Sequence, residues 1–361
     1  MLKKFLVLIL LPVVLMIGFI ACEGPEGPAG PAGAAGNDGQ IGPDGSLFCL
    51  TCHATEAMDA IEMQFAQAGH SEPYTRFTST SCAPCHSHEG FVEYGNNGQI
   101  ELDEAYTHGS KMTCGTCHSH SNNGAPAVFD TTEGLVPIRF NDPVVLRTGQ
   151  PDMDFGNNSN VCVRCHSPRR AWSEYDDETG DMVMLTSSHA GPHHGAQATG
   201  LMGMGGDHRL NSVSDASTLG PSTHGTGAGC VSCHMNDNDH TFKPVAAACV
   251  DCHAVDDDLD YNGKSAAIVA KMATLAEYLV AVEGNAIARD TAGVWQVIPD
   301  SMVHGPLHLE EDGYHPVVGQ YERNVYSAFW NYMTVMEDQS GGVHNPPYLE
   351  ALLDNAIAVF E

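Results

Sequence analysis

Hydrophobic and polar positions follow different patterns in successive parts of the chain. Residues 5–20 form an uninterrupted apolar run behind Lys3 and Lys4, which is typical of a secretory signal peptide rather than a membrane span. Residues 47–254 show little regular hydrophobic spacing, and clusters of glycine, asparagine and serine indicate loops. Helical spacing of apolar residues returns only beyond residue 260. The pattern predicts an exported protein with a loop-rich middle and a helical end.

The C-terminal section, residues 261–361, contains three segments that predict helices. Residues 264–288 have apolar side chains at helical spacing, residues 320–342 stop at a pair of glycines, and residues 347–360 begin with a proline. We interpret the aromatic and methionine faces of these segments as core positions. The section is therefore expected to be helical and to pack on the middle of the chain.

Glycine recurs at every third position from residue 24 to residue 45, directly after Cys22. This period, with several prolines, is collagen-like, because only glycine fits at the axis of a triple helix. We favour a single-chain, semi-rigid spacer for residues 22–46. The alternative is a true triple helix, which would make the protein a homotrimer.

Cysteine usage identifies the chemistry. The chain has 13 cysteines, and the twelve other than Cys22 fall into six Cys-x-x-Cys-His motifs, the attachment signature of c-type haem. The alternatives, zinc sites or disulfides, do not require a histidine after every second cysteine. In chain order, the motifs are motif 1 (Cys49, Cys52, His53), motif 2 (Cys82, Cys85, His86), motif 3 (Cys114, Cys117, His118), motif 4 (Cys162, Cys165, His166), motif 5 (Cys230, Cys233, His234) and motif 6 (Cys249, Cys252, His253).

The motifs predict six haem c groups, each with two thioether bonds and the motif histidine as proximal iron ligand. Six haems share little more than two hundred residues, so the porphyrins must supply much of the core of residues 47–260. We expect a mainly α fold with extensive loops. The haem-packed domain would carry the C-terminal helices and follow the stalk, and folding would depend on the cofactors.

Fourteen of the 20 histidines lie outside the motifs, and a haem iron often takes a second strong ligand on its distal side. His108 and His224 share the sequence Thr-His-Gly shortly before a motif, an internal repeat that suggests one unit used twice. His70 is in a looser version of the same arrangement. His240 lies between motifs 5 and 6, within reach of both haems.

Three segments resemble parts of bacterial multihaem c-type cytochromes: DHTFKP before motif 6, SSHAGPHHGAQATGLMGMGG at residues 187–206, and GVHNPPYLEALL near the C-terminus. That superfamily includes the ammonia-forming nitrite reductases and extracellular electron-transfer cytochromes. The resemblance implies that histidines in these segments are distal ligands. It nominates His240, His344 and one of His189, His193 and His194.

From that trio we choose His194, because a glycine follows it as in the repeated Thr-His-Gly sequence. His304 is the alternative to His70. The six distal candidates are His70, His108, His194, His224, His240 and His344.

The remaining histidines are interpreted as nonligands. His88 and His120 follow a proximal histidine too closely to reach the opposite face of the same haem. We likewise do not expect the core methionines to bind iron. The side chains treated as structural are His208, His308, His315, Met272 and Met333.

Cys22, directly after the apolar run, resembles the acylated cysteine of a bacterial lipoprotein. Residues 1–21 would then be removed and Cys22 would carry the acyl chains that hold the protein on a membrane. Phe19 departs from the small residues usual three places earlier, and a secreted protein with a free Cys22 is the alternative. Resemblance to c-type cytochromes implies export in either case. We expect an outer membrane lipoprotein at the cell surface or the periplasmic face.

Acidic residues outnumber basic ones by 45 to 15, a formal net charge of −30. This balance argues against nucleic-acid binding and favours either cationic partners or simply solubility. The runs at 236–240 and 256–260 have the oxygen donors that calcium binds, but we favour solvated acidic loops.

Function follows from the number of iron ligands. If every iron has two imidazoles, no position is open for substrate, and the haems exchange electrons with redox partner proteins or an extracellular acceptor. The first alternative is a reductase of nitrite or another small oxyanion with one open haem. In the ammonia-forming nitrite reductases the catalytic haem usually carries lysine at the motif position, whereas all six motifs here end in histidine. The second alternative is a subunit of a cytochrome filament.

Overall fold

The computed structural model describes residues 55–72, 77–98, 100–119, 121–122, 125–126, 138–176, 178–193, 195–254, 259–311 and 313–361. Contacts divide the chain between Leu47 and Phe48, and every described residue belongs to the second unit. Several predictions therefore lie outside the described residues. They concern the signal peptide, Cys22, the stalk, motif 1, His120, His194 and most of the acidic run 256–260.

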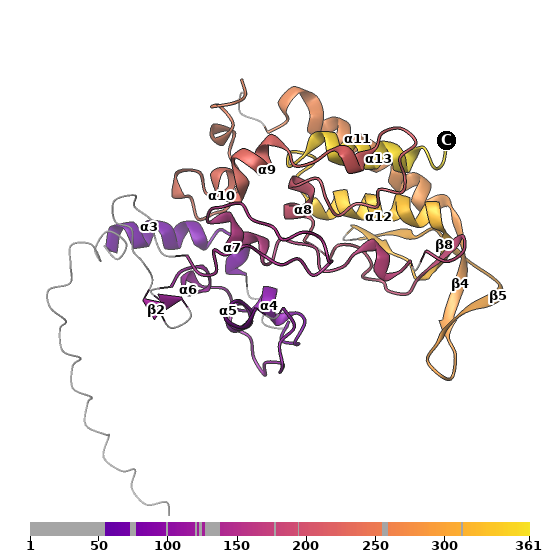
Figure 1. Ribbon diagram of the computed structural model, residues 1–361, viewed down its shortest axis with the longest axis horizontal. Coiled ribbons are helices and arrows are strands. Elements are labelled where there is room, and N and C mark those ends of the chain that lie inside the picture. The colour runs from indigo at the N-terminus through magenta and orange to yellow at the C-terminus, as the bar shows by residue number, and fades with distance from the viewer. Residues whose placement is uncertain are drawn as a thin grey trace, which may run out of the picture. The chain divides into compact units, whose positions relative to one another are not determined.

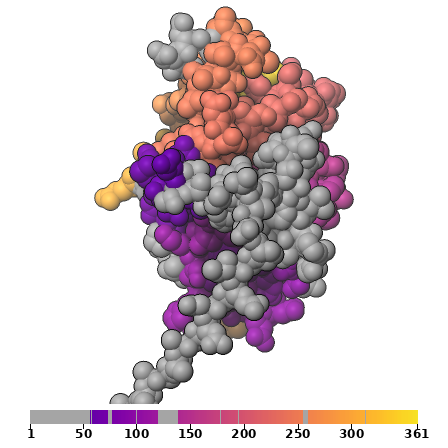
Figure 2. Space-filling view, turned by 90° about the vertical axis from the view of Figure 1, so that its left-hand side faces the viewer, coloured from indigo at the N-terminus to yellow at the C-terminus, as the bar shows by residue number. Residues whose placement is uncertain are grey.

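Short helices joined by loops form the middle of the chain, as the hydrophobic pattern predicted. Motif 2 lies on α4 (Ala83–His86), motif 3 on α6 (Cys114–Cys117) and motif 5 on α10 (Gly229–His234), and motif 4 starts in α7 (Ser159–Val163). The other helical elements are α3 (Thr55–Phe65), η1 (Gly69–Ser71), α5 (His88–Asn97), η2 (Trp172–Glu174), α8 (Gln197–Leu201), η3 (Ala216–Thr218), α9 (Thr223–Gly227), η4 (Asn236–Asn238), η5 (Ala246–Ala248) and η6 (Tyr261–Gly263). Figure 2 shows α3, in indigo, on the surface.

Three longer helices form the C-terminal core. They are α11 (Lys264–Ala281), α12 (Arg323–Asp338) and α13 (Pro346–Ile357), and each packs on the other two (Figure 1). All three were predicted from apolar spacing, although α11 ends at Ala281 rather than near residue 288. Helix α12 is buried on nearly all sides, and its Trp330 is fully buried, so it is the centre of the hydrophobic core.

The sequence did not predict the strands, of which β4 to β8 lie between α11 and α12 along the chain and β1 to β3 precede α11. The expectation of a purely helical C-terminal section is corrected, because this section is mixed α and β. An antiparallel sheet has the strand order β3-β8-β4-β5, with β3 (Met182–Leu185), β8 (Gly319–Glu322), β4 (Glu283–Arg289) and β5 (Trp295–His304). Two small antiparallel pairs join β6 (Leu307–Glu310) to β7 (Gly313–Pro316) and β1 (Ser121–Asn122) to β2 (Ala125–Pro126).

The local sequence explains why β4 replaces the end of the predicted helix. Gly284 lies against the ring of Tyr321 on β8, and a Cβ atom at this glycine would be 2.3 Å from that ring. Tyr321 is almost fully buried, so its packing fixes the position of β4. Pro299 lies within β5 at the edge of the sheet, where a missing backbone N–H costs no ladder hydrogen bond.

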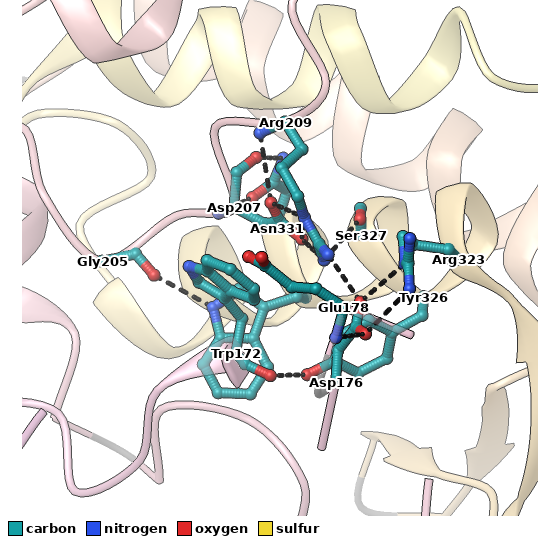
Figure 3. Close-up of polar contacts among 11 residues, drawn as sticks. Trp172, Asp176, Glu178, Gly205, Asp207, Arg209, Arg323, Tyr326, Ser327 and Asn331 are labelled. Carbon is teal, nitrogen blue, oxygen red and sulfur yellow. Dashed lines mark hydrogen bonds and ion pairs between the residues drawn. The ribbon is translucent and has the colours of Figure 1, made fainter. Parts of the chain in front are cut away.

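A buried cluster of charges joins the middle of the chain to α12 (Figure 3). The guanidinium of Arg209 forms ion pairs with Asp207 and Asp176, and it lies 4.2 Å from the ring centre of Trp172. Arg323 at the start of α12 forms a second ion pair with Asp176. Burial alone would raise the pKa of Asp176, but the hydrogen bonds and charges of the two arginines lower it below its usual value.

The apolar run at residues 5–20 lies outside the described residues. In the part of the chain that the structure describes, no helix combines the length and the apolar character that crossing a bilayer requires.

Candidate haem sites

Each described motif forms a single helical turn, which places its two sulfurs and its histidine on one side of the chain. The backbone N–H of the histidine donates to the carbonyl of the first cysteine, at 3.1 Å in motif 2, 2.9 Å in motifs 3 and 4, and 2.8 Å in motif 6. Motif 5 lies entirely within α10. This geometry fits two thioether bonds to one porphyrin with an imidazole beneath it.

Four motif histidines each face a predicted distal histidine. The ring centres of His166 and His70 are 6.0 Å apart, and those of His118 and His240 are 6.3 Å apart. Histidines on the two sides of one iron, with metal–nitrogen bonds of about 2 Å, have ring centres about 6 Å apart. The separations therefore fit an iron between the two rings.

The other two pairs involve motifs 5 and 6. The ring centres of His234 and His344 are 6.3 Å apart, and those of His253 and His224 are 5.9 Å apart. His224 precedes motif 5 in the sequence, yet it faces the histidine of motif 6. The structure thus brings together four distal candidates, each with a different motif histidine.

Hydrogen bonds at Nδ1 orient four of these imidazoles. Nδ1 of His224 lies 2.8 Å from the carbonyl of Val343, and the corresponding distances for His234 and His240 are also 2.8 Å, to the carbonyls of Phe242 and Asn238. A donor hydrogen on Nδ1 leaves Nε2 unprotonated, which is the tautomer that can bind a metal. The fourth oriented imidazole is that of His344, whose Nδ1 lies 2.7 Å from Oδ1 of Asp338.

Burial favours the neutral form of the pair at motif 4. It lowers the pKa of His166 to about 4, and the neighbouring His70 adds to the shift, while a side-chain hydrogen bond with Gln197 opposes it. Burial also lowers the pKa of His70. Neutral imidazole is the form that ligates metals, so both rings are suited to bind an iron.

Sulfur atoms of different motifs lie side by side. The thiol of Cys85 in motif 2 hydrogen-bonds to Cys165 in motif 4, and the thiol of Cys162 hydrogen-bonds to Cys230 in motif 5. Cys85 and Cys165 each also lie 4.0 Å from a backbone carbonyl of the other motif. Cys117 in motif 3 lies near enough to both cysteines of motif 4 to contribute to the raised pKa of their thiols. Motif 4 is therefore next to motifs 2, 3 and 5.

Motifs 5 and 6 are also neighbours, since the proximity of Cys249 contributes to the raised pKa of the Cys233 thiol. Phe242 connects three of the candidate sites. Its ring centre lies 4.9 Å from that of His70 and 5.9 Å from that of His240, and its carbonyl oxygen faces Nδ1 of His234. No sequence pattern singled out Phe242, whose φ of +56° is uncommon for a residue other than glycine.

Other histidines predicted as distal candidates are not among the four pairs with a motif histidine given above. His108 is exposed, and His189 is exposed with its Nδ1 3.2 Å from the hydroxyl of Ser188. His193 is partly buried with a φ of +65°. The segment around His193 contacts motif 4, because the N–H of Arg169 donates to the carbonyl of Pro192 at 2.9 Å.

The histidines predicted as reserves or nonligands have other surroundings. His304 is exposed at the end of β5, whereas His70 faces motif 4. Nδ1 of His88 lies 2.9 Å from the hydroxyl of Thr116, and Nε2 of His208 lies 2.8 Å from that of Tyr348. His308 and His315 pair across the β6–β7 hairpin.

The ring of Phe77 lies beside the proximal histidine of motif 2, with its centre 4.8 Å from that of His86.

In the acidic run 236–240, the carboxylate of Asp239 accepts hydrogen bonds from the backbone and hydroxyl of Thr241. Across the described ranges, no group of three or more histidine, cysteine, aspartate or glutamate side chains is arranged to hold a metal ion directly.

No protein-family model and no curated protein matches the chain. Two solved structures share partial likeness with it. One is an undecahaem cytochrome from the S-layer of Carboxydothermus ferrireducens, with 17% identity, a TM-score of 0.41, and coverage of 84% of this chain and 40% of that one. The other is the outer cell wall cytochrome OcwA, with 18% identity, a TM-score of 0.41, and coverage of 82% and 50%.

The chain thus spans half or less of the length of these two structures. At such scores the likeness assigns neither the fold nor the sites, and the candidate sites rest on the motifs and the histidine pairs.

Proposed function

We propose that this chain is a hexahaem c-type cytochrome that transfers electrons between redox partners through bis-histidine haems. The observation that carries the proposal is the set of four histidine pairs, in which a motif histidine faces a second imidazole at 5.9 to 6.3 Å. An iron held in such a pair has both axial positions filled. It can gain and lose an electron but cannot bind a substrate.

The contacts between motifs suggest a path for electrons. Adjacent sulfurs link motif 2 to motif 4 and motif 4 to motif 5, and motifs 5 and 6 are neighbours. Because the sulfurs bond to the porphyrin edge, neighbouring sulfurs mean neighbouring porphyrins. We infer the order 2–4–5–6, with the haem of motif 3 joining at motif 4 and Phe242 packed among the haems of motifs 3, 4 and 5.

The proposal includes a location and partners. The signal-like N-terminus and the motif chemistry support export, and Cys22 supports attachment to an outer membrane, at the cell surface or its periplasmic face. The acidic surface favours a redox protein with a basic docking face, or an extracellular acceptor. For the glycine-repeat stalk we propose a single-chain spacer, and the alternative is a triple helix that would make the protein a homotrimer.

Spectroscopy of the purified, oxidised protein tests the ligation. We expect a mass equal to the mature chain plus six haems, and electron paramagnetic resonance (EPR) signals from low-spin iron alone. The imidazole planes are near-perpendicular in two pairs, at 80° and 75°, which leaves the iron dπ orbitals nearly degenerate. These two haems should give highly anisotropic low-spin signals, unlike the pair inclined at 35°. High-spin iron in one-sixth of the haems would favour a reductase instead.

Membrane attachment is tested separately through Cys22. Changing Cys22→Ser removes the thiol that would be acylated, so the variant should move from the membrane fraction to the soluble fraction with its haem content unchanged. Cell fractionation with haem staining measures both properties. A variant that still sediments fully with membranes would exclude Cys22 as the anchor.

A further inference from the structure

The hydrogen-bond acceptor at His344 differs in kind from those at the other oriented imidazoles. Nδ1 of His224, His234 and His240 faces a backbone carbonyl, whereas Nδ1 of His344 faces the carboxylate of Asp338. A hydrogen bond to a charged acceptor is stronger than one to a neutral carbonyl. It also places more negative charge on the imidazole, including Nε2 on the far side of the ring.

Helix stability does not explain the position of Asp338. It is the last residue of α12, where the helix macrodipole disfavours a negative charge, and its side chain is 0% exposed. Among the ion pairs of the described residues, its partner is His344 alone. Burying a carboxylate without a positive charge nearby is costly, so a site that supplies such a charge through His344 accounts for this placement.

The chain beyond α12 is shaped to make this contact. Gln339 and Gly341 have φ values of +57° and +58°, and the resulting turn brings His344 back over the end of the helix. The second carboxylate oxygen of Asp338 accepts hydrogen bonds from the backbone and hydroxyl of Ser340. A Cβ atom at Gly200 would lie 2.7 Å from Oδ1, so glycine leaves the room that the carboxylate occupies.

We propose that Asp338 lowers the reduction potential of the haem at motif 5 by charging its distal ligand, an inference that rests on the proposed function. The ferric haem carries one more positive charge than the ferrous haem. A negative charge passed to the iron through His344 therefore favours the oxidised state. Asp338 is a positioning residue, because it acts on the iron through another side chain.

The carboxylate makes the haem of motif 5 more reducing than the same site would be with a neutral acceptor at His344. This haem lies between motifs 4 and 6 in the inferred path. The charge of Asp338 therefore affects how readily electrons pass from motif 4 through motif 5 to motif 6.

The test is a redox titration of the purified holoprotein monitored by EPR, comparing wild type with Asp338→Asn. The amide keeps the size of the side chain and can still accept from Nδ1, but it removes the charge. The midpoint potential of one haem should rise by about 59 mV for one electron. At a fixed applied potential, this shift changes the oxidised-to-reduced ratio of that haem about tenfold. The other haems should keep their midpoints, and all should stay low-spin.

Asp239→Asn is the matched control, since it removes a carboxylate one residue from His240 that bonds to Thr241 rather than to an imidazole. Its midpoints should stay close to those of wild type. Ser340→Ala is the second variant, for use if Asp338→Asn loses haem. This variant removes the hydrogen bond that the Ser340 hydroxyl donates to Asp338. The carboxylate then places more negative charge on His344, and the midpoint potential of one haem should fall.

The inference is overturned if Asp338→Asn shifts no haem more than the control does, or shifts all haems together. If it fails to assemble, an unchanged or raised potential in Ser340→Ala overturns it. Failure of the proposed function would look different, because wild-type protein itself would then contain high-spin iron or fewer than six haems.

Discussion

Replacing His240 by alanine is expected to convert one haem of six to high spin while the protein keeps its full haem content. The ring of His240 faces the proximal histidine of motif 3, His118, at 6.3 Å, and alanine leaves that iron with one protein ligand. EPR should show high-spin iron in one-sixth of the total. The reduced protein should bind one molecule of carbon monoxide, which needs an open axial position.

His208→Ala is the control for this change. His208 is partly buried, but its Nε2 bonds to the hydroxyl of Tyr348, so its loss should leave all haems low-spin. An unchanged spectrum in His240→Ala, or high-spin iron in His208→Ala, would contradict the assignment of ligands.

The pairing itself is tested by His224→Ala in two backgrounds. His224 faces His253 of motif 6, although it precedes motif 5 in the sequence. In the wild-type background the variant should produce one high-spin haem. When both cysteines of motif 6 are changed to alanine, that haem is absent, and His224→Ala should then produce none. High-spin iron in the second background would assign His224 to another motif.

The haem motifs could be predicted from the sequence alone because their chemistry is local, and haem attachment at them stays a prediction. Two sulfurs and a histidine within one helical turn need no distant contact, and in motifs 2, 3, 4 and 6 a hydrogen bond from the histidine N–H to the carbonyl of the first cysteine closes that turn. Resemblance and the Thr-His-Gly repeat also nominated the four histidines that the structure pairs. Their ligation of iron stays a prediction until the ligand variants are measured.

Which histidine faces which motif could not be predicted, because it depends on long-range contacts. His70 precedes motif 2 but faces motif 4, and His344 comes from the C-terminal section to face motif 5. Asp338 and Phe242 were missed for the same reason. The available signal was an aspartate at the end of a predicted helix, where the macrodipole disfavours it.

The C-terminal sheet was missed for a different reason. Apolar residues continue from α11 into β4, so helical spacing alone gives no boundary between the two. The boundary is set by packing, because Gly284 lies against Tyr321, which is 37 residues later in the chain and belongs to β8. Antiparallel pairing with β8 then fixes β4 as a strand, and this contact is invisible to a local pattern.

The buried charge cluster explains how the middle of the chain is held on α12. The backbone N–H of Asp207 donates to Oδ1 of Asn331 at 2.7 Å, and the amide of Asn331 donates to the carbonyl of Asp207 at 3.1 Å. Arg209 then compensates the carboxylate of Asp207, which is 0% exposed. The cluster therefore anchors the segment that leads from the candidate haem sites into the C-terminal core (Figure 3).

Changing Arg209→Met is expected to destabilise the folded protein by about 3–5 kcal/mol, because it leaves the carboxylate of Asp207 buried without a positively charged partner. Urea unfolding of the holoprotein, followed by far-ultraviolet circular dichroism, should show a lower midpoint at an unchanged slope. Lys264→Met is the matched control. It removes an ion pair with Glu350 whose lysine is 54% exposed, and should cost less than about 1 kcal/mol.

A double variant, Arg209→Met with Asp207→Asn, separates lost charge compensation from lost packing. Removing both charges eliminates the uncompensated carboxylate, so the double variant should be more stable than Arg209→Met alone. If the free energy of unfolding of Arg209→Met lies within about 1 kcal/mol of that of wild type, the cluster does not hold the two sections together. If instead the double variant is less stable than the single one, packing of the arginine over Trp172 dominates its contribution.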